Sequence, residues 1–308
     1  MKTYSAIING ELHQQLFDHL IREDEQEDLC FATYVPSTGA NRTTGIITSL
    51  IMPEDGDRNV HGNVGFMPQY LERVLKIAGE RKEGIAFLHS HPSSGWQGMS
   101  DDDVIAETRL SPTVMAITGL PLLGLTLGTD SAWSGRFWLK DDTRKRKYNR
   151  AWCDTVRLVD KQLSITYYDE ILPPSFDAGK QLRTISAWGS KTQEDLSRLR
   201  VGIVGLGSVG SIVAEVLART GIANFTLIDF DAVEEKNLDR LTNVFKNDID
   251  RAKVLAVADG IRRSATAPKV EIHCCEYSVC EKEGFETALN CDVLFSCADR
   301  PWPRQVLN

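Results

Sequence analysis

The sequence predicts a two-domain α/β protein, and three observations support this fold class. The chain has 308 residues, whereas single domains usually run to about 100–200 residues. Its 42% apolar and 25% charged residues are typical of a globular protein. From Arg200 onward, strand-like and helix-like runs alternate strictly, while the first half of the chain mixes them less regularly. We therefore expect two domains, of which the second is a doubly wound parallel sheet.

The first half predicts two helices, because apolar residues recur at helical spacing over 11–22 and over 68–80. The second of these opens with a proline, which is favoured at the first helical position. Apolar runs between and after the helices predict strands over 29–35 (ended by Pro36), 45–53, 84–92, 113–119 and 122–128.

The domain junction is expected between these strands and the alternating region. Residues 140–150 are densely charged and have no apolar period, and residues 164–182 contain Pro173, Pro174 and several turn formers. We place the first domain at 1–160, a linker at 161–179 and the second domain at 180–308.

The second half predicts a Rossmann-like unit. A strand enters a glycine turn at 201–207, and a helix closed by Gly221 follows it. The remaining pattern gives strands over 224–231, 269–279 and 291–297, with helices over 247–263 and 281–290. Strands that alternate with helices imply parallel pairing, with helices on both faces of the sheet.

Composition also excludes several classes of protein. The formal net charge is −8, which disfavours nucleic-acid binding, and no apolar run is long enough to span a membrane. The start of the chain lacks the apolar core of a signal peptide. Seven cysteines, an odd number, lie largely in apolar runs and form no C-x-x-C pair. We therefore expect reduced thiols and a cytoplasmic location.

A first candidate site begins with His89 and His91. Two positions apart on a strand, the two imidazoles point to the same face. With the carboxylate of Asp103 they offer three zinc ligands and leave a fourth position open for water. Zinc makes hydroxide available from that water near neutral pH, and the hydroxyl of Ser100 can steady an oxyanion. The simpler alternative is that Ser100 and Asp103 only form a capping box at a helix start.

The full string, H-S-H-P, seven residues, then S-x-x-D, resembles the JAB/MPN (JAMM) family of zinc metalloproteases. The resemblance implies an α+β fold for the first domain, in which His89, His91 and Asp103 bind zinc and Ser100 supports the oxyanion. It also requires a catalytic glutamate at the start of an early strand. Glu27 is the candidate and Glu25 the alternative, since Cys30 stands where the family has glycine.

A second candidate site begins at the glycine turn of Gly205, Gly207 and Gly210. Such a turn brings backbone close to phosphate, and the helix that follows favours the anion. Asp229 ends the next strand, where a carboxylate commonly takes ribose hydroxyls. Further along, the chain offers Asn237, Arg240 and Lys253 for phosphates and Asp299 for Mg²⁺. This set favours a triphosphate over a nicotinamide cofactor.

This second set resembles the ThiF/MoeB adenylation domain shared with ubiquitin-activating enzymes. The resemblance implies that ATP and the C-terminal glycine of a ubiquitin-like protein give an acyl-adenylate and pyrophosphate. Arg183 is the candidate for an arginine donated across a homodimer of such domains. Because the sequence ends at Asn308, soon after Asp299, we expect this domain to be incomplete.

The combined expectation is a zinc peptidase or isopeptidase that processes or deconjugates a ubiquitin-like protein, fused to an ATP-dependent activating domain. A conjugating-enzyme-like protein is a further expected partner. Two alternatives remain: adenylation as the main activity with an accessory protease, and a binding module whose second domain is not catalytic.

Overall fold

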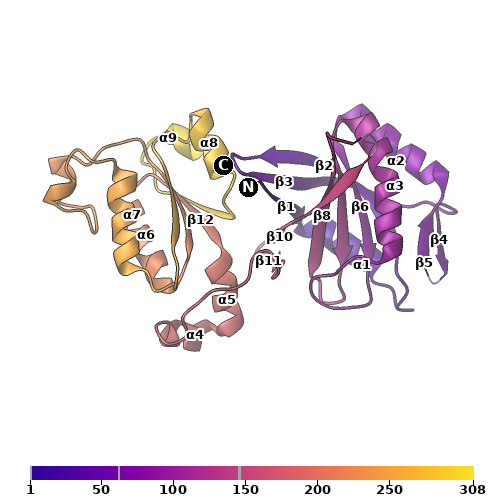
Figure 1. Ribbon diagram of the computed structural model, residues 1–308, viewed down its shortest axis with the longest axis horizontal. Helices are drawn as coiled ribbons and strands as arrows, with labels where there is room; N and C mark the ends of the chain where they lie inside the picture. The colour runs from indigo at the N-terminus through magenta and orange to yellow at the C-terminus, as the bar shows by residue number, and fades with distance from the viewer. Residues whose placement is uncertain (1, 62, 145–146) are drawn as a thin grey trace. The chain divides into compact units, whose positions relative to one another are not determined.

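The computed structural model describes residues 2–61, 63–144 and 147–308, and the chain divides into two compact units (Figure 1). The first unit runs to residue 37 and resumes over 43–171. The second unit contains residues 38–42 and 172–308.

The first unit is built on a nine-stranded mixed sheet with the order β11-β10-β1-β3-β2-β6-β7-β8-β9. Two neighbouring pairs, β1 with β10 and β6 with β7, run parallel. The strands are β1 (Thr3–Asn9), β2 (Leu29–Thr38), β3 (Arg42–Ile51), β6 (Gly84–Ser90), β7 (Leu122–Leu127), β8 (Trp133–Lys140), β9 (Tyr148–Trp152), β10 (Thr155–Val159) and β11 (Leu163–Tyr167). A separate hairpin joins β4 (Arg58–His61) to β5 (Asn63–Phe66).

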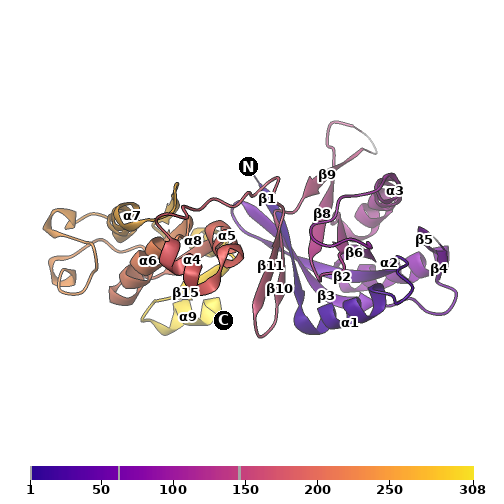
Figure 2. The same ribbon diagram turned by 90° about the horizontal axis from the view of Figure 1, so that it is seen from below.

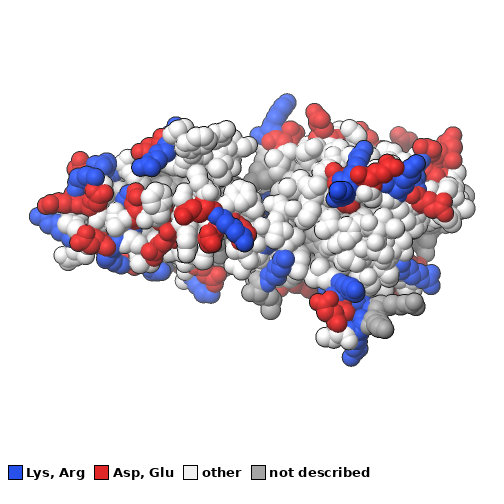
Figure 3. Space-filling view, turned by 90° about the horizontal axis from the view of Figure 1, so that it is seen from above, with Lys and Arg blue, Asp and Glu red and all other residues white. Residues whose placement is uncertain are grey.

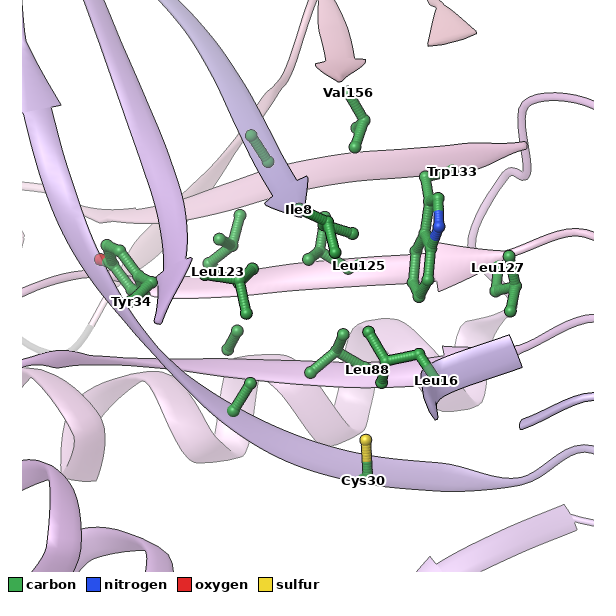
Figure 4. Packing of buried hydrophobic residues seen from close by; sticks show 14 of the residues in the cluster. Ile8, Leu16, Cys30, Tyr34, Leu88, Leu123, Leu125, Leu127, Trp133 and Val156 are labelled. Carbon is green, nitrogen blue, oxygen red and sulfur yellow. The ribbon is translucent and has the colours of Figure 1, made fainter. Parts of the chain in front are cut away.

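Helices cover both faces of this sheet (Figures 1 and 2). On one face, α1 (Gly10–Leu20) buries Leu16 and Leu20 in a cluster with Ile8, Leu88 and Trp133. Figure 4 shows Leu16 among the other labelled residues of this cluster. On the other face, α2 (Pro68–Arg81) and α3 (Asp101–Thr118) pack on Phe31, Phe87 and neighbouring residues. Each fully buried aliphatic or aromatic side chain stabilises the fold by about 1.5–3 kcal/mol relative to exposure. The strand β6 is therefore packed on both of its faces.

The second unit has a parallel sheet in the order β14-β13-β12-β15. The strands are β12 (Arg200–Val204), β13 (Asn224–Ile228), β14 (Glu271–Cys275) and β15 (Val293–Ser296). Helices α6 (Ser208–Thr220) and α7 (Lys253–Ser264) bury one face, and α8 (Lys282–Ala288) and α9 (Pro301–Leu307) pack on the other. Two further helices, α4 (Leu182–Trp188) and α5 (Ser190–Arg198), precede β12. The predicted Rossmann-like arrangement is confirmed.

Three sequence predictions of secondary structure were wrong. Residues 113–119 belong largely to α3, although Pro112 lies inside that helix. Burial of Leu110 and Val114 against the sheet outweighs the apolar run that suggested a strand. Pro36 does not end β2, which continues to Thr38. Pairing between β2 and β6 stops at Tyr34, so no residue of β6 lies opposite Pro36 to accept the backbone N–H that proline lacks. The helix predicted over 247–263 begins only at Lys253, since Asp250 adopts a left-handed φ of 68°.

The junction also differs from the prediction. Residues 163–167, placed in the linker, form β11, which pairs with β10 as an edge of the sheet. Residues 140–150 contain the ends of β8 and β9, which pair with each other. Most of the described residues of this stretch are exposed, which accounts for its charged character. Among the residues described, no helix is long and apolar enough to cross a lipid bilayer.

Candidate functional sites in the two units

The first site lies where β6 ends. His89 is the penultimate residue of this strand, and His91 follows its last residue. The backbone N–H of His91 donates to the carbonyl of Leu127, 2.9 Å away, so the chain stays tied to β7 beyond the strand. His89 is almost fully buried (2% exposed), which excludes a role as a surface histidine.

Asp103 reaches the two histidines from the first turn of α3. Ser100 caps this helix: its Oγ accepts the N–H of Asp103 at 3.1 Å, and Asp103 Oδ2 accepts the N–H of Ser100 at 2.8 Å. Ser100 and Asp103 therefore form the capping box that the sequence offers as the simpler alternative. It does not compete with a metal role, because it orients the same carboxylate toward the histidines.

Three potential ligand atoms converge at this point. The Nε2 atoms of His89 and His91 lie 3.2 Å apart, and each lies 3.3 Å from an oxygen of Asp103. Among the residues described, this is the one group of histidines, cysteines and carboxylates that meets the spacing for a metal ion. Two imidazoles and a carboxylate suit zinc with an open position. The donor set therefore fits the expected ion.

The electrostatics of Asp103 favour its charged form. Burial alone would raise its pKa, but hydrogen bonds with His89 and His91 outweigh burial and hold the pKa well below its usual range. A carboxylate that remains deprotonated is ready to bind a cation.

Glu27 lies on the open side of this cluster. Its Oε1 is 3.8 Å from His91 Nε2, and its side chain is 30% exposed. The next residue, Asp28, fixes this position: its N–H donates to Ser90 Oγ at 3.0 Å, and its carbonyl accepts the N–H of Ser90 at 3.1 Å. Glu25, the alternative, does not share this ion-pair contact in the described structure. Its backbone has a left-handed φ of 57°.

A cavity of about 260 Å³ opens beside Glu27 and His91. Its other lining residues are Leu20, Ile21, Arg22, Glu25, Gln26, Ser90, Pro92 and Thr129. Glu27 and His91 therefore both line this cavity, and Glu27 is not one of the three residues whose ligand atoms converge.

The second site is the glycine turn between β12 and α6. Gly205 has a φ of 87°, and a Cβ there would lie 2.8 Å from the backbone N of Ala298. Gly207 caps α6, and a Cβ built on it meets no atom within 4 Å, so its free side faces open space. The turn therefore exposes backbone N–H groups and the start of a helix to an anion.

Asp229 stands directly after β13 and is 9% exposed. Its carboxylate accepts the N–H of Leu206 at 2.6 Å and the N–H of Asp231 at 2.8 Å. Burial raises its pKa, although these two donors act in the opposite direction. The side chain joins the glycine turn to the loop that follows β13, and it still has lone pairs for ribose hydroxyls.

A cavity of about 460 Å³ brings most of the predicted nucleotide residues together. It is lined by Gly205, Gly207, Asp229, Asn237, Arg240, Lys253 and Asp299. Lys253 begins α7, and its Nζ lies 2.7 Å from Asp231 Oδ2. Arg240 lies half-exposed and donates to the carbonyl of Lys236 at 2.8 Å. Of the predicted side chains, two cations, an amide and an exposed carboxylate thus line one cavity, together with the carboxylates of Asp231 and Glu234.

Gly210 and Arg183 do not line this cavity. Gly210 acts behind the turn: a Cβ there would lie 2.0 Å from the carbonyl oxygen of Gly205. Arg183 lies exposed on α4, and its assignment depends on a second copy of the chain.

Sequence reasoning missed several residues of this cavity, among them Lys236, Tyr277 and Arg300. Lys236 could have been predicted, because it directly precedes Asn237 in the sequence. Nothing in the sequence pattern distinguishes Tyr277 from other surface aromatics.

On the face shown in Figure 3, acidic and basic side chains are interspersed. This face therefore carries no continuous positive surface that would attract an anion.

Comparisons with known proteins bear on this second unit. Residues 179–308 match the sequence model of the ThiF family. Ubiquitin-like modifier-activating enzyme 5 of Caenorhabditis elegans is 31% identical over 126 residues, 37% of this chain and 29% of that protein. The tRNA threonylcarbamoyladenosine dehydratase of Escherichia coli K12 is 38% identical over 80 residues, 26% of this chain and 30% of that protein.

A crystal structure of the E. coli tRNA N6-threonylcarbamoyladenosine dehydratase aligns with a TM-score of 0.39 and 27% identity, covering 42% of this chain and 54% of that one. The chain spans about a third of the length of the curated relatives it matches. The family match itself covers residues 179–308 and says nothing about the residues before them. Residues 179–308 form a ThiF-family domain.

Proposed function

We propose that the second unit is an ATP-dependent activating enzyme of the ThiF type, which adenylates a carboxylate of its substrate. The observation that carries this proposal is the 460 Å³ cavity, where the glycine turn, Asp229 and the cations Arg240 and Lys253 meet. A NAD site has no need for this concentration of cations, whereas a triphosphate carries about four negative charges to be neutralised.

In the proposed reaction, an oxygen of the substrate carboxylate attacks the α-phosphorus of ATP. The bond to the bridging oxygen of the β-phosphate breaks, which gives an acyl-adenylate and pyrophosphate. The glycine turn and the start of α6 bind phosphate oxygens, Asp229 orients the ribose, and Arg240, Asn237 and Lys253 stabilise charge on the leaving pyrophosphate. Asp299 would hold Mg²⁺, which supplies further neutralisation of the phosphates.

The substrate class is proposed from the relatives. The similarity to ubiquitin-like modifier-activating enzyme 5 favours the C-terminal carboxylate of a ubiquitin-like protein. The similarity to a tRNA dehydratase makes a modified tRNA the other candidate, although the net charge of −8 gives the chain little general attraction for RNA.

Pyrophosphate exchange tests this proposal. We expect the full chain to exchange labelled pyrophosphate into ATP only when a ubiquitin-like protein with a free C-terminal glycine is present, and Asp299→Asn to abolish exchange. Exchange that requires tRNA would assign the second substrate class. Tight binding of the ubiquitin-like protein without ATP turnover would overturn the catalytic proposal and leave a binding module.

The first unit supports a second activity. We propose that it hydrolyses a peptide or isopeptide bond with the aid of zinc, as the JAMM resemblance implies. The carrying observation is that His89, His91 and Asp103 converge within hydrogen-bonding distance while Glu27 stands beside them as a separate carboxylate. Zinc, held by the first three residues, would supply water that ionises near neutral pH.

The chain's own residues would carry out the rest of this reaction. Glu27 would take a proton from the attacking water and return it to the leaving amine. The cavity beside it would receive the chain that ends in the scissile bond. Ser100 Oγ is already an acceptor in the helix cap, so its proton remains free to steady an oxyanion.

Metal content and turnover test this second proposal together. We expect the purified chain to hold one zinc and to cleave a fusion behind the C-terminal glycine of a ubiquitin-like protein. Glu27→Gln should abolish cleavage while zinc stays bound, and Glu25→Gln is the matched control that should retain cleavage. Persistent activity in the Glu27 variant would overturn its assignment. We place both activities in a reducing, cytoplasmic environment, because the positions of the seven cysteines suit reduced thiols.

A further inference from the structure

A carboxylate lies among the cations of the nucleotide cavity, and the proposed reaction gives it no role. It belongs to Asp231, which follows Asp229 by two residues and lines the same cavity as Lys253. We infer that Asp231 is a positioning residue that holds the ammonium of Lys253 in one place in the cavity, so that its loss slows adenylation without weakening ATP binding. The inference rests on the ATP-dependent function proposed for the second unit.

The charge of Asp231 acts against nucleotide binding. Its carboxylate and the phosphates of ATP are both negative, and like charges that share one cavity repel each other. The Asp231 side chain is 51% exposed, so water screens part of this repulsion without removing it. Affinity for ATP therefore gives no account of the carboxylate, whereas its contacts do.

Asp231 contacts Lys253 directly. Lys253 Nζ donates to Asp231 Oδ2 at 2.7 Å, and Lys253 as a whole is only 9% exposed. A lysine ammonium is a compact charge on a flexible stem of four carbons, so a fixed partner limits where it lies. The ammonium has three N–H donors, and Asp231 takes one of them. Two donors therefore stay available for phosphate oxygens while the ion pair persists.

The backbone of Asp231 is fixed on both sides. Its N–H donates to Asp229 Oδ1 at 2.8 Å, and its carbonyl accepts the N–H of Lys253 at 2.9 Å. Next to these bonds, Ala232 and Ala252 form an antiparallel β-bridge. The loop after β13 and the residues before α7 are thus paired, and the Asp231 carboxylate extends from a backbone that is held at several points.

The same contacts continue to the glycine turn. Asp229 Oδ2 accepts the N–H of Leu206 at 2.6 Å, while Asp229 Oδ1 accepts the N–H of Asp231. One chain of hydrogen bonds therefore runs from the turn, through the carboxylate proposed for ribose, to Asp231 and Lys253. Donors that are in place before reaction stabilise the charge that develops in the transition state. A displacement of about 1 Å in such a group can cost about 100-fold in rate.

Asp231→Ala is the direct test, because it removes the carboxylate and keeps both backbone hydrogen bonds. In the full chain, calorimetric titration with MgATP measures affinity. Pyrophosphate exchange at saturating ATP, with the ubiquitin-like protein that supports exchange in wild type, measures the rate. We expect ATP to bind at least as tightly as in wild type, because the repulsion is gone, and exchange to be about 10–100-fold slower, because Lys253 is no longer held.

Two further variants show whether the effect passes through Lys253. Asp231→Asn should give an intermediate rate, since its amide oxygen can still accept from Lys253 Nζ but carries no charge. The double variant Asp231→Ala/Lys253→Met should exchange as fast as Lys253→Met alone, because the carboxylate then has no ammonium to hold. A separate, additional loss of rate in the double variant would overturn the inference.

Asp259→Ala is the matched control. Asp259 lies on α7 with a side chain 39% exposed, pairs with Arg251 and Arg262 at 2.9 Å each, and does not line the cavity. This variant should keep both the ATP affinity and the exchange rate of wild type.

The remaining outcomes are each decisive. Weaker ATP binding in Asp231→Ala, with an equal loss of rate, would show a merely structural role, and tighter binding with an unchanged rate would show an effect of charge alone. A raised Mg²⁺ requirement would make Asp231 a metal ligand. Each of these results overturns the inference. If Asp231→Ala does not fold, Asp231→Asn takes its place, and a wild-type rate in that variant overturns the inference. A wild-type chain that binds ATP but exchanges no pyrophosphate overturns the proposed adenylation, and the positioning role with it.

Discussion

A Cβ atom built on Gly210 would lie 2.0 Å from the carbonyl oxygen of Gly205. This close approach lets the glycine turn fold back on the first turn of α6. Gly210→Ala should therefore force the turn apart, with a loss of about 1–3 kcal/mol in stability and a loss of ATP binding.

Gly207→Ala separates the two effects, because a Cβ at this position meets nothing within 4 Å. We expect this variant to keep its thermal stability but to bind ATP more weakly, since the methyl group stands where phosphate must approach. Melting curves and calorimetric titration with ATP measure both quantities. An equal loss of stability in the two variants would contradict this account of the turn.

Lys253 is held at the cavity by Asp231, with 2.7 Å between Nζ and Oδ2. Lys253→Met should weaken ATP binding by about 10–100-fold, because a hydrogen bond to a charged group contributes about 1.5–3 kcal/mol. Arg262→Met on the same helix is the control: that guanidinium is exposed, pairs with Asp259 and does not line the cavity. Similar ATP affinities in the two variants would exclude Lys253 from the nucleotide site.

Removal of zinc should destabilise the first unit. At a free zinc concentration about 100 times the dissociation constant, binding stabilises the folded chain by about 2.7 kcal/mol, and a chelator should reverse this. His89→Ala should abolish the effect of chelator on the melting temperature. His273→Ala, an exposed histidine on β14 of the second unit, should preserve it. A melting temperature indifferent to chelator in the wild-type chain would argue against the metal site.

Ser100 has two proposed roles that substitutions can divide. If Ser100 acts as a helix cap, Ser100→Ala should lower the free energy of unfolding by about 1 kcal/mol, and Ser100→Gly should lower it by only a few tenths of a kcal/mol. If the Ser100 hydroxyl also donates to the oxyanion, both variants lack that donor, so Ser100→Ala and Ser100→Gly should lose turnover to the same extent. If turnover instead falls only in the less stable variant, Ser100→Ala, then Ser100 acts only as a helix cap.

The candidate ligands were predictable because their chemistry depends on local spacing. Alternation along a strand places His89 and His91 on one face, and the S-x-x-D pattern marks the start of a helix whose first turn carries Asp103. The glycine turn and Asp229 were predictable for the same reason, since each follows directly from the end of a strand.

Other features depend on contacts between distant segments. The helical state of residues 113–118 follows from burial of α3 against the sheet, which outweighs a local apolar run. The edge strand β11 exists because β10 offers it a partner, although its own residues look like a linker. Asp231 and Lys253 are separated by 22 residues, and no local pattern marks them as a pair.

The sequence by itself determined which groups this protein offers: two imidazoles and a carboxylate at the spacing of a candidate metal site, and a glycine turn with cations for a proposed nucleotide site. The tertiary structure decided which groups meet. It set Glu27 beside His91, gathered Lys253, Arg240 and Asp299 around one cavity, and linked Asp231 to both Asp229 and Lys253. The physical reason is that residue type and short spacing fix reactivity and local direction, whereas convergence requires the burial and strand pairing of segments far apart in the chain.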